Sequence, residues 1–176
     1  MVNKKADVWV STVLYILIGM AVIGVLLAVI KPKVAEMKDS LSIDQTVESL
    51  NKFDEIMLRT RQATGTRLSY ELMLSRGDLQ LNTRSENITW IIRDSSYRYS
   101  QEGVPIKIGN IEILTEKKGQ FWQVMLTRDY SASNINILYS GADTDKVLTA
   151  SKMPYKIFLE NQGLVENKQK IDITIE

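Results

Sequence analysis

Few side chains in this sequence have the chemistry of an enzyme active site. The 176-residue chain contains no histidine and no cysteine, so it lacks the commonest general base, and thiolate metal ligands and disulfides are excluded. Catalysis by Asp, Glu, Lys, Ser or Tyr remains open, and a membrane-bound hydrolase would need two carboxylates converging in one cleft. No paired-carboxylate motif, phosphate-binding loop or nucleophile elbow is visible. We therefore expect no enzyme activity, no cofactor and no metal.

Three short motifs would carry chemistry in other contexts. Arg76-Gly77-Asp78 is a cell-adhesion tripeptide in some extracellular proteins, but here it lies between two alternating segments, where Gly and Asp are normal turn residues. Asp143-Thr144-Asp145 offers oxygen ligands for Ca²⁺ but lacks the other ligands of a calcium loop, so a plain turn is the better interpretation. Asn87-Ile88-Thr89 is an N-glycosylation sequon, which predicts a glycan on Asn87 and favours a location outside the cytoplasm.

The overall charge gives no sign of a nucleic-acid partner. The chain has 22 basic and 21 acidic side chains and a net charge of +1. Proteins that bind nucleic acids present a clustered basic surface instead. We therefore expect no nucleic acid among its partners.

The most biased segment is an uncharged, apolar run from Val8 to Ile30. As a helix it would be about 34 Å long, slightly more than the ~30 Å hydrocarbon core of a bilayer. Lysines bound it on both sides, Lys4 and Lys5 before it and Lys31 and Lys33 after it. A buried core helix needs fewer consecutive apolar residues, and a cleaved signal peptide has a shorter apolar core. The sequence therefore predicts a single-pass anchor in the cell membrane.

Helical periodicity continues beyond the apolar run, over residues 33–60. Apolar side chains recur at intervals of three and four, at Val34, Met37, Leu41, Ile43, Val47, Leu50, Phe53 and Met57. Acidic residues are expected on the remaining, exposed surface, at Asp39, Asp44, Glu48, Asp54 and Glu55. Lys31-Pro32-Lys33 could break or kink the helix, and an interruption near Ser40-Leu41-Ser42 is left open. Its apolar stripe has to be buried, either against the protein's own head or against the same helix in neighbouring subunits.

From residue 66 the period changes to two, which predicts short strands. Alternating segments occur at 68–74, 79–81, 87–93, 104–113, 121–130, 135–139, 147–148, 155–159 and 171–175. We expect a bulge at Gly109-Asn110, a hairpin turn at Lys117-Lys118-Gly119 and a turn near Gly163. The predicted fold is α+β: a helix spanning a membrane half (7–30) and an amphipathic stalk half (31–62), then an antiparallel β-sandwich or barrel head (63–176).

The first residues carry a recognisable arrangement. Lys4-Lys5-Ala6-Asp7, followed directly by the apolar run, resembles the class III signal of archaeal type IV pilins and archaellins. In that family a prepilin peptidase cuts on the cytoplasmic side of the helix, after a basic pair and a small residue. The resemblance implies removal of a leader (1–6) between Ala6 and Asp7. It also implies an archaeal source, because Ser11 stands where bacterial members have glutamate.

The resemblance implies a function as well. The mature chain would keep its helix and build a surface filament, as a major or minor pilin or pseudopilin, with the head outside the cell. A prepilin peptidase, an assembly ATPase and a polytopic platform protein are the implied partners, besides the membrane and other copies of the chain. Gly19, Ala21, Gly24 and Ala28 would allow the close helix packing of a filament core. The alternative is a single-pass, signal-anchored protein with an extracytoplasmic binding domain.

Overall fold

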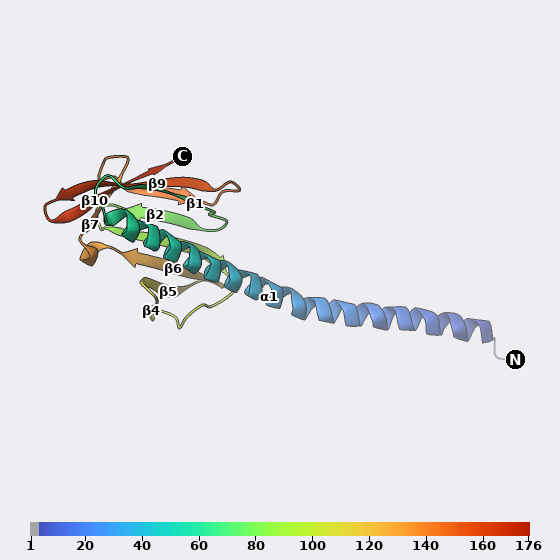
Figure 1. Ribbon diagram of the computed structural model, residues 1–176. Coiled ribbons are helices and arrows are strands. Elements are labelled where there is room, and N and C mark those ends of the chain that lie inside the picture. The colour runs from blue at the N-terminus through green and yellow to red at the C-terminus, as the bar shows by residue number, and fades with distance from the viewer. Residues whose placement is uncertain (1–3) are drawn as a thin grey trace.

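One long helix carries a β-rich head at its C-terminal end (Figure 1). The computed structural model describes residues 4–176, and for residues 4–8 and 10 it describes only the backbone. The helix is α1 (Lys4–Arg61) and is followed by strands, with one short 3-10 helix, η1 (Ser131–Ser133). The strands are β1 (Arg67–Leu72), β2 (Asp78–Asn82), β3 (Asn87–Ser95), β4 (Ile106–Ile108), β5 (Ile111–Lys118), β6 (Phe121–Asp129), β7 (Ile135–Tyr139), β8 (Lys146–Thr149), β9 (Tyr155–Val165) and β10 (Lys168–Ile175). The predicted α+β class is confirmed.

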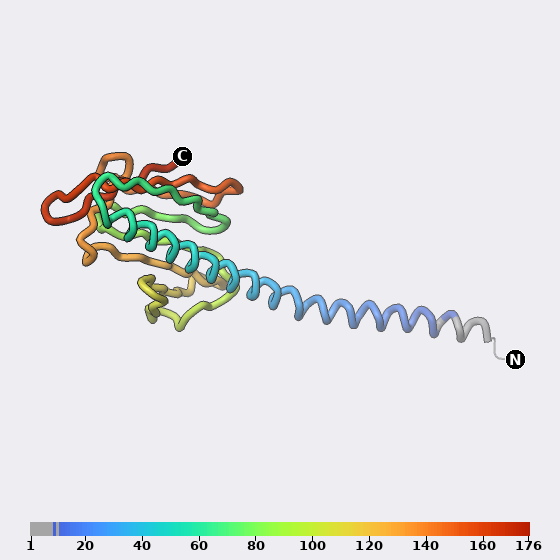
Figure 2. Tube along the Cα trace, in the orientation of Figure 1, coloured from blue at the N-terminus to red at the C-terminus, as the bar shows by residue number. Residues whose placement is uncertain are grey.

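The helix runs without interruption from the apolar segment into the head. Pro32 lies inside it, and the segment 40–42 is helical, so the helix is not broken at either of the two places where the sequence left a break open. A proline removes one backbone hydrogen bond and crowds the preceding turn. The helix nevertheless continues through Pro32, and its first buried residue after the proline is Asp39. The apolar segment and the head are therefore joined by one helix, which Figure 2 traces along its length.

The apolar stripe of α1 divides into two faces. Leu41 and Ile43 are two positions apart and lie about 200° apart around a helix. Side chains from Ile43 onward are buried in the head core, at Ile43, Val47, Leu50, Phe53 and Met57. Those before it, Val34, Met37 and Leu41, are exposed. The protein's own head is thus the partner of the second part of the stripe, and α1 packs against strands of both sheets.

The head is a sandwich of two open sheets, so the barrel alternative is wrong. One sheet has the order β1-β9-β10-β7 and the other β4-β5-β6-β3-β2-β8. Alternate residues of the central strands point into the core, for example Ile88, Trp90 and Ile92 of β3. The prediction of a wholly antiparallel head needs one correction, because β7 and β10 pair in parallel. The chain leaves β7, adds β8 to the other sheet, and returns through β9, which supplies the crossover that a parallel pair requires.

Two turn predictions are wrong and one is confirmed. Gly109 and Asn110 form the turn of the β4–β5 hairpin rather than a bulge within one strand. Gly163 is part of an irregularity inside β9, opposite Lys170, and the turn to β10 comes later, at Glu166-Asn167, where both residues have positive φ. The hairpin after Lys117 and Lys118 forms as expected between β5 and β6.

A side chain from β9 closes the C-terminal end of α1. The last carbonyls of a helix have no partner within the helix itself. The Asn161 side chain donates hydrogen bonds to the carbonyls of Thr60 and Arg61, each at 3.1 Å. The Arg61 side chain in turn donates to the carbonyl of Ser133 at 2.8 Å. These contacts fix the end of the helix on the head.

Candidate membrane helix and helix–head junction

The first half of α1 is apolar and extends away from the head (Figure 1). In its most apolar 18-residue window the mean hydropathy is 3.0, and none of the window is buried. Large apolar side chains from Trp9 to Ile30 are between 37% and 73% exposed. A core helix of a soluble protein would be mostly buried, so this interpretation does not fit. By length and composition, the helix can cross a membrane.

The four small residues expected to allow helix packing lie in the exposed, N-terminal half of α1. Gly19, Ala21, Gly24 and Ala28 are exposed. A Cβ built on Gly19 or Gly24 would meet no atom of the protein within 4 Å. The fold of a single chain therefore places no demand on these glycines, and any requirement for a small residue there comes from outside the chain.

The residues of the expected leader are only partly described. Met1 to Asn3 lie outside the described residues. For Lys4, Lys5, Ala6 and Asp7 the helical backbone alone is described. The expected cut between Ala6 and Asp7 therefore stays a prediction.

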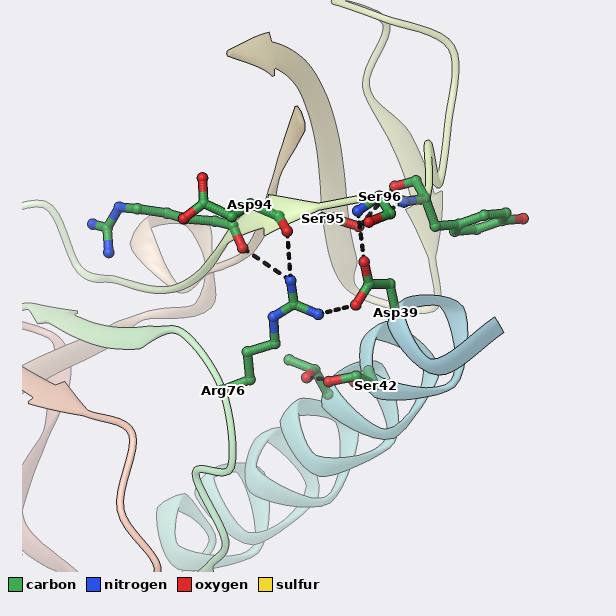
Figure 3. Close-up of polar contacts among 9 residues, drawn as sticks. Asp39, Ser42, Arg76, Asp94, Ser95 and Ser96 are labelled. Carbon is green, nitrogen blue, oxygen red and sulfur yellow. Dashed lines mark hydrogen bonds and ion pairs between the residues drawn. The ribbon is translucent and has the colours of Figure 1, made fainter. Parts of the chain in front are cut away.

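An ion pair fixes the point where α1 leaves the head (Figure 3). The Arg76 guanidinium donates to the Asp39 carboxylate, and the other carboxylate oxygen accepts the Ser96 N–H at 2.5 Å. Arg76 also donates to the carbonyls of Arg93, at 3.2 Å, and Asp94, at 2.8 Å. The helix, the loop before β2 and the irregular end of β3 are thus held by one guanidinium.

A second ion pair lies deeper along the helix. Arg128 of β6 donates through Nε to Asp54 at 2.7 Å, and only 6% of the Asp54 side chain is exposed. Asn110 donates to the other oxygen of Asp54 at 2.9 Å. The Arg128 guanidinium also lies 4.4 Å from the centre of the Tyr130 ring. The buried carboxylate is therefore paired and hydrogen-bonded, as burial of a charge requires.

The expectation that Asp39 and Asp54 lie on the exposed surface of α1 is wrong. The spacing of these two residues from the buried apolar residues of α1 already indicates that they face the head. Asp39 lies four residues before Ile43, and Asp54 lies four residues after Leu50, so both fall on the face that packs against the head. Acids on the apolar face of an amphipathic helix indicate buried ion pairs, whose partners have to come from elsewhere in the chain.

Tyr99, which lies beside the helix–head junction, predicts a dependence of the protein's stability on pH. Burial, and then the hydrogen bond that Tyr99 donates to Asp44 at 2.9 Å, raise the pKa of Tyr99 to about 12. A raised tyrosine pKa stabilises the fold fully below pH ~10, and this contribution is lost as pH rises from ~10 to about 12. We expect Tyr99→Phe to make the decline in stability over this range less steep than in the wild type. Urea unfolding in mild detergent at a series of pH values measures the difference, and equal slopes would contradict it.

The adhesion-like tripeptide and the acidic turn both have structural roles. Arg76 is held by Asp39, and Asp78 pairs with Arg93, so both charged side chains of the tripeptide are engaged within the fold. Asp145 accepts hydrogen bonds from the N–H of Thr83, at 2.9 Å, and from its hydroxyl. Among the described residues, no group of three or more Asp, Glu, His or Cys side chains could hold a metal ion.

Asn87 is one of the residues that line a polar hollow of about 380 Å³ on the surface of the head. Its side chain accepts from Asn82 at 2.7 Å and donates to Ser85 at 3.0 Å, so the sequon lies at the end of the β2–β3 hairpin. Two carboxylates, Glu112 and Asp129, line the same hollow. The Ser131 N–H lowers the pKa of Asp129, the opposite of the shift that a general acid near neutral pH needs.

Comparisons with known proteins identified no relative of this chain. No protein-family model matches the chain, and searches of curated proteins and of solved structures found no match. The fold itself defines the class of protein: an α+β chain with a β-sandwich head and an N-terminal helix that can cross a membrane.

Proposed function

We propose that this chain is a structural subunit of an archaeal type IV pilus-like surface filament, a major or minor pilin or pseudopilin. Its leader is removed between Ala6 and Asp7, the retained helix anchors it in the cell membrane, and the head lies outside the cell. Assembly exchanges the lipid around the helix for helices of other copies. A prepilin peptidase, an assembly ATPase and a platform protein are the partners of this process, and the role is structural rather than catalytic.

The main support is the exposed apolar half of α1. From Trp9 to Ile30 its described large side chains are exposed, and at about 25 cal/mol per Å² such a surface strongly favours an apolar environment. Lipid supplies that environment before assembly, and neighbouring helices supply it afterwards. Gly19 and Gly24, where an added Cβ would point into open space, allow close approach between helices.

The test is processing in cells that contain a working prepilin peptidase. The wild-type chain from native membranes is expected to lack Met1 to Ala6 by intact mass, and to appear in the filaments sheared from cells. Ala6→Phe puts a bulky side chain before the cut, so we expect a full-length chain that stays in the membrane and is absent from filaments. Val2→Phe, a change in the same leader but away from the cut, is the matched control and should be processed normally.

An uncut wild-type chain, monomeric in mild detergent and absent from sheared filaments, would contradict the proposal. That result would instead favour a singly anchored protein with an extracytoplasmic binding domain.

A further inference from the structure

Four loops gather at the end of the head from which α1 leaves. Residues 73–77 and 96–105 both bond to Asp39, through Arg76 and Ser96. Residues 117–121 adjoin the second loop, because Trp122 pairs with Ser95. Residues 150–154 adjoin the first, since the Ser151 N–H donates to the Leu74 carbonyl at 2.8 Å. We call these four segments the helix-exit rim; its first two loops can be followed beside the helix in Figure 2.

Each loop of the helix-exit rim exposes one large apolar side chain. These side chains are Met73 (53% exposed), Val104 (43%), Phe121 (44%) and Met153 (75%). The loops come from distant parts of the sequence, and the fold brings them to one end. Single exposed apolar residues are normal on a protein surface. These four are spread along one end of the head, from the β4 edge to the β8 edge of the six-stranded sheet, so a flat surface is the kind of partner that would contact them together.

The same rim is basic. Its exposed charged side chains are the cations Arg98, Lys117, Lys118 and Lys152 and the acid Glu102, and Lys118 also pairs with Glu116 of β5 at 3.1 Å. Arg98 and Lys117 each lie 5.7 Å from the ring centre of Trp122, which is half-buried. Basic, apolar and aromatic side chains together are the composition that binds an anionic membrane surface.

The helix brings this rim close to the bilayer. From Ile30 to Asp39 it rises about 13 Å, at 1.5 Å per residue. The headgroup layer covers about 5–8 Å of that rise, half the difference between bilayer and hydrocarbon thickness. Because the head packs on one face of α1, a tilt of about 20°, which is average for a membrane helix, lowers the rim on that side further.

We propose that the helix-exit rim binds the anionic lipid headgroups of the membrane in which α1 is anchored, with Phe121 and Met153 entering the interface. This inference rests on the placement of the apolar half of α1 in lipid, and does not require filament assembly. Bound in this way, the head lies against the membrane, and its release from lipid accompanies any transfer of the helix out of the bilayer.

The absence of cysteine makes the test direct, because single cysteines can be labelled without background. Full-length Phe121→Cys and Met153→Cys chains carrying a nitroxide label are placed in phosphatidylcholine vesicles with and without phosphatidylglycerol. Leu164→Cys is the matched control: it is 60% exposed but lies about 30 Å along β9 from Tyr155, at the far end of the head. Leu17→Cys reports whether α1 itself lies in lipid.

With phosphatidylglycerol, labels at 121 and 153 should show a severalfold higher ratio of oxygen to nickel-complex accessibility than the label at 164. Adding Lys117→Glu should reduce this ratio, and Lys107→Glu, an exposed cation on β4 outside the rim, should not. Rim labels that behave like the label at 164, while the label at 17 lies in lipid, overturn the rim proposal alone. Rim labels shielded from both reagents in proportion to protein concentration also overturn it, because they indicate contact with a second copy. A label at 17 in water overturns both this inference and the proposed function.

Discussion

Replacing Asp54 with alanine is expected to lower the free energy of unfolding of the head by about 3–5 kcal/mol, since it leaves a buried guanidinium without its partner. The Arg128 side chain is 12% exposed and makes its ion pair with Asp54. Asn110 loses its acceptor at the same time. Urea unfolding of the full-length chain in mild detergent, followed by near-ultraviolet circular dichroism, measures the loss.

The neighbouring residue supplies the control for this change. Glu55 also pairs with an arginine, Arg59, at 3.7 Å, but both side chains are about two-thirds exposed. Exposed ion pairs contribute little to stability, so Glu55→Ala should leave the unfolding midpoint nearly unchanged. Equal effects of Asp54→Ala and Glu55→Ala would show that the buried pair does not hold the helix to the head.

Phe53→Ala is expected to cost about 3–5 kcal/mol through the cavity it leaves in the shared core of helix and sandwich. Phe53 is 2% exposed, and its ring packs edge-on against Tyr70 of β1 at a centroid distance of 6.0 Å. The prediction is a large fall in the urea midpoint with an unchanged fold at low denaturant.

Leu41→Ala is the matched comparison on the same helix. Leu41 is 59% exposed on the face turned away from the head, so its loss should change the stability of the monomer by no more than about 0.5 kcal/mol. A large effect at position 41, or a small one at position 53, would reverse the assignment of the two faces of α1.

The second half of α1 is rigidly attached to the head. The segment from Ile43 to Met57 belongs to the head core, and the Asp39 and Asp54 ion pairs fix it at two further points. The head therefore does not hang on a flexible linker. A force or displacement applied to the apolar half of α1 therefore reaches the sandwich directly, which the proposed filament role would require.

Local pattern was sufficient to predict much of this protein. The uncharged run from Val8 to Ile30 predicted the exposed apolar helix, because insertion into lipid depends on the length and composition of one segment. Alternation predicted strands such as β3 and β7, and glycine with a lysine pair predicted the β5–β6 hairpin. Periods of two and 3.6 residues report which side of an element is buried, and they need no distant partner.

The tertiary structure alone decided what depends on distant residues. Asp54 and Arg128 are 74 positions apart, and the sequence around either residue does not predict that the other is its partner. The parallel pairing of β7 with β10 follows from the path of the chain through both sheets. The rim with Met73, Val104, Phe121 and Met153 exists because the fold brings four segments to the same end of the sandwich. Sequence period determined the elements and their buried sides; contacts between segments far apart in the chain determined which elements pair and which loops come together at the helix-exit rim.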